Sequence, residues 1–518
     1  MKRTYIFIFS IMISTNIFSQ TPKKLHYVEK RLPYPIYPYL ENPVGASKRF
    51  QNLFYESLVD DNAQNNGYES RHINIESCRL DGNRFIVEFI EGWSWNDGYT
   101  GPVTPGDLKY SIEAANEFGV FKPVLIDKVK IESKNIVLYL GYQYTQSIKD
   151  DILDRMRQVI VVPKAFSNEL EEFVESPTGT GAFRWDETEG RKIKLYSIDG
   201  DMSLLGKPYI DEVVIEEIPL LMSHWKNMQD FEEINLLIES TRISKTDAIK
   251  DNNYTVKPYA SDQVSFLIFN YDNDLFEDRE IRLAIDLVVN KPELVKGTLQ
   301  GEGDVMSGPF SKKNPYYEPK VKDNGHAPDS AKKLIESILD EKTGDYYEYL
   351  GKPVHLKLIY DRGLNDEEES VILQIEKELE NIGIKVTKKS LITPNYRIAL
   401  KKGKFDIAFF KYQFGRRSFA HQLFASNELL RKKGYVSNNF GNYSNEKVDA
   451  LVEAWLETDD RTSKQDKGKQ FHATLHDDIA CIFLFSQTSY AIHHKSIQPI
   501  IIPYYFFGRP HEWKIGDN

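Results

Sequence analysis

The segment from 354 to 390 restricts the fold most, because two strand patterns flank one helix pattern within it. The residues VHLKLIY alternate in the way that is typical of a strand. Asn365 and Asp366 can cap a following helix, and Gly383 can end it. The apolar stripe of that helix consists of Val371, Ile372, Ile375, Leu379 and Ile382. IKVTKKSL then predicts a second strand, and this order predicts a right-handed crossover between parallel strands.

A third strand pattern, KFDIAFF, extends the predicted parallel sheet, and a helix over about 396–402 precedes it. Ligands of such sheets bind beyond the carboxyl ends of the strands. The residues that follow this strand include Tyr412, Phe414, Gly415, Arg416 and Arg417. Each arginine carries a permanent charge and a planar fork of donors. We therefore expect either a solvated loop, whose arginines pair with surface acids, or a binding site for an anionic group.

Two further passages carry structural patterns and no reactive group. In residues 84–116, a strand pattern leads through a turn into a helix whose start is marked by Thr104, Pro105 and Asp107. Residues 176–185, SPTGTGAFRW, are rich in glycine. Because they lead into a strand pattern and lack the lysine of a phosphate loop, they predict a tight turn.

The N-terminus has the pattern of a secretory signal peptide. Lys2 and Arg3 precede a short apolar run that ends at Ser14, and Ser19 offers a small residue for cleavage. We therefore expect residues 1–20 to be removed and the mature chain to be periplasmic; an uncleaved anchor is the alternative. No cysteine lies near the cleavage point, so a lipid anchor has no attachment atom there.

Length, charge and cysteine content narrow the class of protein. The 518 residues predict two or three domains. The net charge of −11 argues against a nucleic-acid surface, because phosphate binding needs a concentrated basic face. Cys78 and Cys481 allow one disulfide, but their wide separation leaves the pairing open.

Catalytic and metal-binding patterns are absent from the sequence. His472 and His476 have a spacing that can hold zinc, but Ala473 replaces the glutamate that a metalloprotease needs. We expect this pair to lie on an exposed helix face. His493 and His494 are adjacent in a strand pattern and should point to opposite faces. No Gly-x-Ser-x-Gly elbow occurs. We therefore predict no catalytic residue, no metal ligand and no cofactor.

Five stretches of the chain match one family pattern. The first three are NLFYESLVDDN, GWSWNDGYTGPVTPGDLKYSIEAA and SPTGTGAFRW. The fourth is residues 266–303, and the fifth consists of APDSAKKLIESI, ELENIGIKV, FDIAFF and GNYSNEKVDALV. In this order they resemble the solute-binding proteins of bacterial ATP-driven (ABC) importers, within the large peptide/nickel-binding family.

The resemblance implies an α/β fold of two lobes with a central ligand cleft, which is the type II periplasmic-binding-protein fold with an extra subdomain. Lobe I would comprise residues 21–66, 180–268 and 481–518, the inserted subdomain residues 67–179, and lobe II residues 269–480. Crossovers near Asn270 and at 481–485 would form the hinge. The ligand would make the contacts that favour the closed state.

The resemblance also implies where a solute binds. In peptide-binding relatives, an aspartate that holds the amino group of the ligand falls at about Gly415, but no acid occurs from Tyr412 to Phe419. Arg416 and Arg417 stand there instead. A guanidinium repels an ammonium and clamps a carboxylate or phosphate. We therefore expect an anionic or carboxylate-bearing solute, or else arginines that pair with acids across the lobes.

The other site residues are implied with the same family pattern. They are Tyr412 and Phe414 as apolar walls, Asn270 and Tyr271 at the hinge, and Val44 and Gly45 beside an extended ligand. Asn270 could instead only fix the hinge, and the segment up to Gly45 could be a plain turn.

The implied function is capture of a peptide or another small solute and its delivery to the membrane permease of an ABC importer. The protein would be a monomer without nucleic-acid partners. Two alternatives remain open: a ligand-sensing or scaffold protein on the same fold, and an exported hydrolase.

Overall fold

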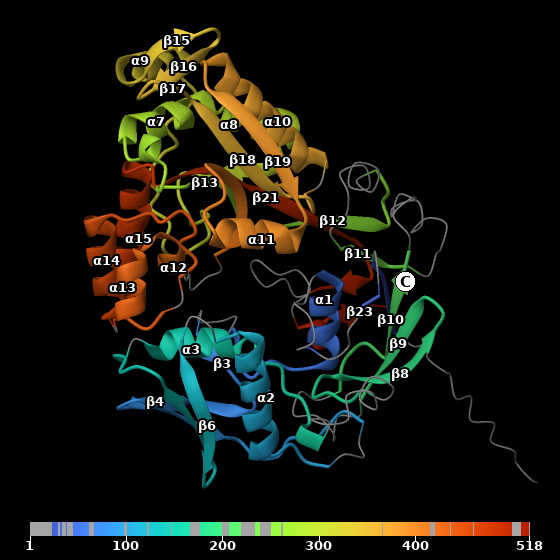
Figure 1. The fold of residues 1–518 in the computed structure, drawn as a ribbon. Helices are drawn as coiled ribbons and strands as arrows, with labels where there is room; N and C mark the ends of the chain where they lie inside the picture. Colours follow the sequence, from blue (N-terminus) through green and yellow to red (C-terminus); the bar gives the residue numbers. More distant parts are fainter. Residues whose placement is uncertain are drawn as a thin grey trace, which may run out of the picture.

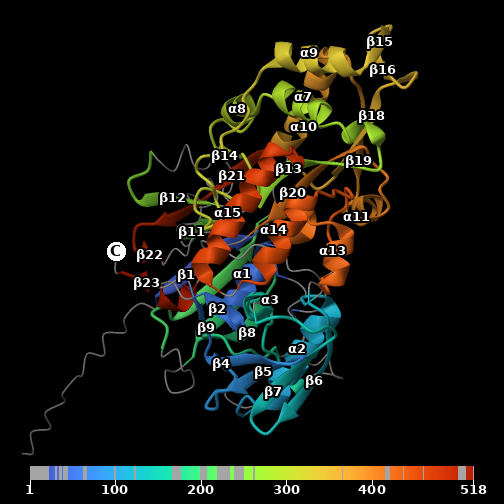
Figure 2. The same cartoon turned by 90° about the vertical axis from the view of Figure 1, so that its left-hand side faces the viewer.

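The computed structural model contains two lobes and an additional four-stranded sheet (Figures 1 and 2). The described residues are 23–29, 32–33, 38, 45–61, 67–97, 101–121, 124–146, 148–165, 177–198, 207–218, 234–238, 250–260, 263–364, 366–414, 420–435, 437–458, 460–499 and 509–516. Within this part of the chain, no helix combines the length and the apolar character that a membrane span requires.

A sheet of twelve strands runs through both lobes. In this structure, lobe II is the part that contains the strands β13 (Gln263–Phe269), β18 (His355–Asp361), β19 (Lys385–Leu391) and β20 (Ile407–Gln413). Lobe I is the part that contains the strands β1 (Lys24–Glu29), β8 (Phe183–Glu189), β9 (Lys192–Ser197), β10 (Glu212–Glu217) and β11 (Leu236–Ile238). Three further strands complete the sheet: β12 (Tyr254–Ala260), β14 (Gly303–Val305) and the long strand β21 (Cys481–His494).

The long strand β21 (Cys481–His494) joins the two lobes. Its residues 481–485 pair with β13 of lobe II, and its residues 491–493 pair with β11 of lobe I. Because β13 also pairs along its whole length with β20, it belongs to the lobe II sheet. We therefore propose that the lobe boundary lies before Gln263; the division into domains otherwise stays a prediction.

The predicted strand–helix–strand unit is confirmed. β18 and β19 pair in parallel, and α10 (Asp366–Asn381) connects them. Apolar residues of α10 share one buried cluster with Leu356 and Leu358 of β18, whereas α11 (Thr393–Lys401) packs on Ile359 on the other face. Helices therefore cover both faces of the lobe II sheet, as expected for α/β layers. The helix α11 begins earlier than predicted because Pro394 fits its first turn.

The four-stranded antiparallel sheet forms, with two helices, a part that we call the insert. Its strands are β4 (Ile73–Asp81), β5 (Arg84–Phe89), β7 (Asn135–Leu140) and β6 (Ile126–Glu132) in spatial order, and its helices are α2 (Pro105–Phe118) and α3 (Ile148–Met156). The predicted start of α2 is confirmed, because Thr104 and Asp107 form a capping box. In Figure 1, α3 lies on the side of the insert that faces lobe II.

The remaining helices of the described residues surround the sheets. They are α1 (Gly45–Phe54), α7 (Arg279–Val288), α8 (Lys291–Glu293), α9 (Pro328–Ile338), α12 (His421–Phe424), α13 (Asn427–Lys432), α14 (Glu446–Leu456) and α15 (Arg461–Asp477), with short helical turns at Asp274–Phe276, Leu294–Thr298 and Pro510–Glu512. Small strand groups are formed by β2 (Asp60–Asp61) with β3 (Tyr68–Glu69), by β15 (Asp340–Thr343), β16 (Tyr346–Tyr349) and β17 (Lys352–Pro353), and by β22 (Ile497–Gln498) with β23 (Lys514–Ile515).

The glycine-rich passage is a site of close packing. The Asn96 backbone amide donates to the Gly179 carbonyl at 2.8 Å, and the Gly179 amide donates to Asn96 Oδ1 at 2.9 Å. The side-chain amide of Asn96 also donates to the carbonyls of Phe54 and Phe183 at 3.2 and 2.7 Å. A Cβ atom on Gly179 would come within 2.1 Å of the Phe54 carbonyl oxygen. The glycine therefore lets the chain approach the end of α1, and the passage holds lobe I against the insert.

Candidate functional site

Several predicted site residues lie where the structure makes no statement. Val44, Gly415, Arg416 and Arg417 fall outside the described residues, and Gly45 is the first residue of α1. Their role in solute binding stays a prediction.

Tyr412 and Phe414 lie at the end of β20. The strand continues to Gln413 because it pairs with β13, so Tyr412 lies within the strand, opposite Val264, and the prediction that it follows the strand was wrong. Phe414 is only 4 % exposed and packs against Phe310 at 6.2 Å between ring centroids. Tyr412 packs on Phe414 at 4.9 Å and is half-buried. Of the two aromatics, Tyr412 is therefore the better placed to contact a solute.

Asn270 is held inside lobe II. Its amide nitrogen donates to the carbonyls of Gly403 and Phe405 at 3.2 and 2.9 Å, and its oxygen accepts from the Asp272 amide. Both amide hydrogens are thus used by the turn that precedes β20. These contacts favour the alternative in which Asn270 fixes the backbone at the end of β13.

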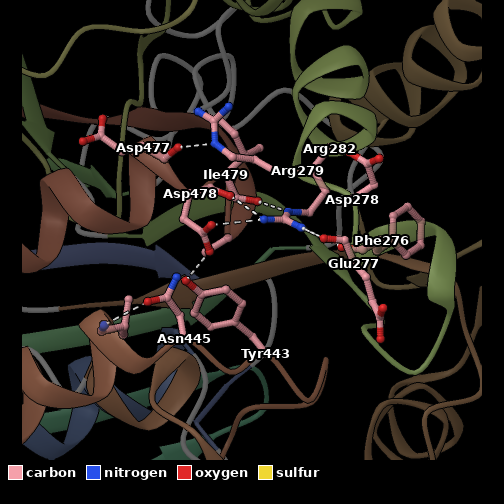
Figure 3. Close-up of polar contacts among 12 residues, drawn as sticks. Phe276, Glu277, Asp278, Arg279, Arg282, Tyr443, Asn445, Asp477, Asp478 and Ile479 are labelled. Atoms are coloured by element: carbon pink, nitrogen blue, oxygen red, sulfur yellow. Dashed lines mark hydrogen bonds and ion pairs between the residues drawn. The ribbon is translucent and has the colours of Figure 1, made fainter. Parts of the chain in front are cut away.

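Tyr271 belongs to a polar network around Arg282 that fixes the entry into β21. The guanidinium of Arg282 lies 5.2 Å from the ring centroid of Tyr271 and donates five hydrogen bonds (Figure 3). The acceptors are the carbonyls of Phe276, Glu277, Asp478 and Ile479 and the Asp478 carboxylate. Tyr443 donates to the other Asp478 oxygen at 2.6 Å. The network bonds both segments near the predicted hinge to lobe II.

The insert contacts lobe II along a surface that we call the seam, formed by described residues of 142–155 and 412–464. The Tyr435 hydroxyl donates to the Asp151 carboxylate at 2.7 Å. The hydroxyls of Tyr144 and Thr145 donate to the carbonyls of Gly434 and Leu456 at 3.0 and 3.3 Å. Buried apolar residues of α3 and of α13 to α15 belong to one contiguous cluster. The seam therefore closes the insert on lobe II through both apolar and polar contacts.

Gly434 is required at the seam because of its backbone and its neighbours. It has a φ of 80°, and a Cβ atom there would come within 2.7 Å of Tyr142 and Tyr144. Its carbonyl accepts the bond from Tyr144. The left-handed turn thus lets the two tyrosines cover the end of α13.

The seam brings charged groups close to the strand end at which a solute is predicted to bind. Burial raises the pKa of Asp151, and the charge of Lys464 opposes this. Burial lowers the pKa of Arg155, which lies near Asp154 and Tyr412. Burial also raises the pKa of Tyr412. A cation of the insert thus lies beside the end of β20.

His421, at the start of α12, belongs to the same group. Burial lowers the pKa of His421 to about 3, so the ring is neutral at pH 7. Its ring lies 5.1 Å from that of Tyr435.

Sequence reasoning missed most residues of the seam. Asp151 and Arg155 lie one helical turn apart in DDILDRM, which is a visible pattern of charges on one face of an amphipathic helix. Tyr435 has no such pattern around it, because its role depends on Asp151, which lies 284 positions earlier. The ring of His421 lies beside that of Tyr435, and no pattern in the sequence indicates this contact.

The histidine pair of α15 is not on an exposed face, and that expectation was wrong. His472 is 0 % exposed, and its Nε2 lies 3.5 Å from the Ser307 hydroxyl. His476 contacts the carbonyl of the same serine at 3.0 Å through Nδ1. A third ligand is not in reach, since the described residues contain no group of three metal-ligating side chains. Cys78 and Cys481 are buried and do not pair.

His472 should make the stability of the protein sensitive to acid. Burial lowers the pKa of His472 to about 3, below the value of 6.5 that the unfolded chain has. Below pH 6.5 the unfolded state therefore binds more protons, and stability is lost as the pH falls from 6.5 towards 3. We expect His472→Gln to lose less stability than the wild type between pH 7 and pH 5, measured by urea unfolding. His355→Gln, at an exposed position of β18, should keep the wild-type dependence; an unchanged dependence in His472→Gln would contradict the assignment.

Comparison with known proteins identifies the family to which this architecture belongs. The family model "Bacterial extracellular solute-binding proteins, family 5 Middle" matches residues 80–426. The oligopeptide-binding protein AppA of Bacillus subtilis is 24 % identical over 464 residues, which cover 85 % of this chain and 82 % of AppA.

Solved structures have the same fold. AppA from Bacillus subtilis in complex with a nonapeptide has a TM-score of 0.74 at 19 % identity, over 96 % of this chain and 100 % of that chain. NikA from Staphylococcus aureus in complex with Ni(L-His)2 has a TM-score of 0.67 at 17 % identity, over 95 % of this chain and 100 % of that chain. These likenesses confirm the predicted two-lobed α/β fold. Since the family model matches more than half of the chain, this protein belongs to family 5 of the bacterial extracellular solute-binding proteins.

Proposed function

We propose that the protein captures a small solute between its lobes and delivers it to the permease of an ABC importer. The observation that carries this proposal is the single long strand β21, which pairs with lobe II at one end and with lobe I at the other. The chain then passes between the lobes within β21, at 486–490, and once more between the end of β12 and the start of β13. Two short crossings of this kind permit hinge closure, and a solute that contacts both sides favours the closed state.

We propose that the solute is a peptide or another small molecule that carries a carboxylate. The relatives support this choice, because one contains a nonapeptide and another contains Ni(L-His)2 in its solved structure. Arg416 and Arg417 follow β20 in the sequence and would supply positive charge for such a carboxylate.

Native mass spectrometry of protein purified without denaturation tests the function. We expect a bound small molecule that is released on unfolding, and a higher melting temperature when the stripped protein receives it again. The stripped protein should also be offered a dipeptide, a tetrapeptide, a nonapeptide and the nickel–histidine complex. A protein that carries no molecule and is stabilised by none of these would contradict solute capture.

The paired change Arg416→Ala with Arg417→Ala should weaken solute binding. A charge-assisted hydrogen bond contributes about 1.5–3 kcal/mol, so we expect the affinity to fall by about 10- to 150-fold. Isothermal titration with the solute identified by mass spectrometry measures the change. Arg397→Ala, at an exposed position of α11, is the matched control and should bind like the wild type. If the double variant keeps its full affinity, the two arginines do not hold the solute.

We propose further that residues 1–20, which lie outside the described residues, direct export, and that the mature chain is a free periplasmic monomer. The expected mass of the mature protein, which lacks these residues and any lipid, can be checked by intact mass spectrometry of the periplasmic fraction. A chain that keeps its N-terminus would instead support the uncleaved anchor.

A further inference from the structure

Residues 381–405 of lobe II form a basic part of an otherwise acidic protein. They include β19 and α11 and contain no aspartate or glutamate, although the chain has a net charge of −11. Their basic residues are Lys385, Lys388, Lys389, Arg397, Lys401, Lys402 and Lys404. A block of like charges on a surface, above all one that includes a helix, is typical of a part that meets a charged partner.

The outer side of α11 combines basic and apolar side chains. The helix buries Tyr396 and Leu400 against the lobe II sheet. Ile398 on the outer side is 50 % exposed, and Ile392 at the start of the helix is 45 % exposed. The exposed cations of the same segment are Arg397, Lys401, Lys402 and Lys404. Two of them follow Ile398 by one helical turn and therefore lie on the same side of the helix.

Lys389 of β19 extends this surface. It is exposed and pairs in register with Ile359 of β18. Paired residues of neighbouring strands point to the same face of a sheet, and Ile359 lies in the cluster that α11 covers. The side chain of Lys389 therefore leaves the sheet beside α11. We call the surface that these exposed residues form the basic face; it consists of Lys389, Ile392, Arg397, Ile398, Lys401, Lys402 and Lys404.

The charge of the basic face is not neutralised by the part of the chain that the structure describes. Lys388, on the other face of β19, pairs with Glu376, whereas no cation of the basic face forms an ion pair with a described carboxylate. The carboxylates at its border accept hydrogen bonds from other groups; they are those of Asp272, Asp361 and Asp406. Five exposed cations thus lie beside three carboxylates, and the surplus of positive charge can attract an anionic surface.

The basic face lies away from the strands that cross between the lobes. Figure 2 shows α11 on the right of the molecule and β12 on the left. Lobes that are joined on one side open on the other, so α11 lies on the side on which the lobes would part. Delivery of a solute to a permease would bring this side towards the membrane.

The mixture of side chains selects the partner. Helices that lie on lipid surfaces combine basic residues with apolar ones, which enter the headgroup region. Lysine, which supplies four of the five cations, is a compact point charge that attracts phosphate without a fixed geometry. We propose that the basic face binds anionic lipid headgroups and orients the protein at the membrane surface. This goes beyond solute capture, and an acidic segment of a membrane protein is the other occupant that the test must separate.

Binding to vesicles tests the proposal. The protein should bind vesicles of three parts phosphatidylcholine and one part phosphatidylglycerol at about 50 mM salt and leave them at about 500 mM, because salt screens exposed charges. Each basic side chain near an anionic lipid surface strengthens binding by about fivefold. The paired change Lys401→Glu with Lys402→Glu should therefore lower the affinity for these vesicles by about tenfold or more, measured by co-sedimentation.

The paired change Lys332→Glu with Lys333→Glu is the matched control. It alters the net charge by the same amount at two neighbouring exposed positions of α9, and it should bind vesicles like the wild type. Urea unfolding of both double variants should match that of the wild type, because all four lysines are exposed.

The apolar contribution has its own pair of variants. Ile398→Ser should weaken vesicle binding by about threefold or more, because the isoleucine no longer enters the headgroup region. Leu373→Ser replaces an equally exposed residue, at 51 %, on the outer side of α10, where Glu369 and Glu380 are also exposed. This variant should bind like the wild type.

Three outcomes overturn the proposal. A wild type that does not bind the anionic vesicles at low salt excludes a lipid partner and leaves an acidic protein segment as the occupant. Equal losses for the α11 and α9 double variants would mean that binding follows overall charge. Equal binding to vesicles of phosphatidylcholine alone would mean that headgroup charge is not recognised. Each of these results leaves solute capture untouched, because no solute takes part in the measurement.

Discussion

Arg282→Met is expected to lower the free energy of unfolding by about 3–5 kcal/mol, the range found when one partner of a buried charged network is removed. Arg282 is 4 % exposed and donates five hydrogen bonds, four of them to backbone carbonyls. Methionine keeps much of the apolar packing of the side chain but supplies no donor. The carbonyls of Phe276 and Ile479 then stay buried without these bonds, at a cost of about 1–3 kcal/mol for each unsatisfied group.

The position of the four carbonyls explains why neighbouring residues cannot compensate for the hydrogen bonds that Arg282 donates. Two of them, the carbonyls of Asp478 and Ile479, lie in the turn from α15 into β21, where Ile479 has a φ of 52°. A β-branched residue in this region is strained and persists only when its surroundings hold it there. Without Arg282 the turn can relax, and relaxation would move the first residues of β21 out of register with β13.

Urea unfolding of the solute-free protein measures the effect. Arg279→Met is the matched control, because Arg279 is an exposed arginine of the same helix that donates one bond, to the Asp477 carbonyl. Its unfolding free energy should change by less than about 1 kcal/mol. Equal losses for the two variants would mean that the buried network contributes no more than a surface contact.

The local part of the fold could be predicted from the sequence. The apolar stripe from Val371 to Ile382 and the stop at Gly383 depend only on residues within a few positions of one another, and the structure confirms this helix between two parallel strands. The end of β20 could not be placed in the same way. Its last residues are strand because Val264 and Gln263 pair with them, and this partner lies about 150 positions earlier.

The candidate site was less predictable for a related reason. The family pattern directed attention to the end of β20, where Tyr412 does lie beside charged residues. The charged groups near it, Arg155 and Asp154, come from the insert, and no spacing within either segment indicates that the two segments are close. The exposure of His472 was misjudged because α15 is polar along most of its length, whereas the loop that carries Ser307 covers this one residue.

Gly179→Ala is expected to destabilise the protein by about 3 kcal/mol or more, at the upper end of what overpacking costs. The added Cβ atom would lie 2.1 Å from the carbonyl oxygen of Phe54 and 3.0 Å from the ring of Tyr55. The first of these is a backbone atom, so it cannot rotate away as a side chain would. The end of α1 would have to move. This would disturb the bond that the Asn96 side chain donates to the Phe54 carbonyl and the bond that it accepts from the Gly179 amide.

Gly516→Ala separates this close approach from the general effect of replacing a glycine. The nearest atom to a Cβ at Gly516 is the Ser496 carbonyl oxygen at 3.9 Å, so this variant should unfold like the wild type. If the Gly179→Ala variant is too unstable to purify in quantity, the two variants can be compared by the rate at which a protease cleaves each of them in freshly prepared extract. Equal stability of the two variants would mean that α1 and the glycine-rich passage are not packed as closely as the structure has them. Lobe I would then need another connection to the insert, because Asn96 joins them through the same three backbone segments.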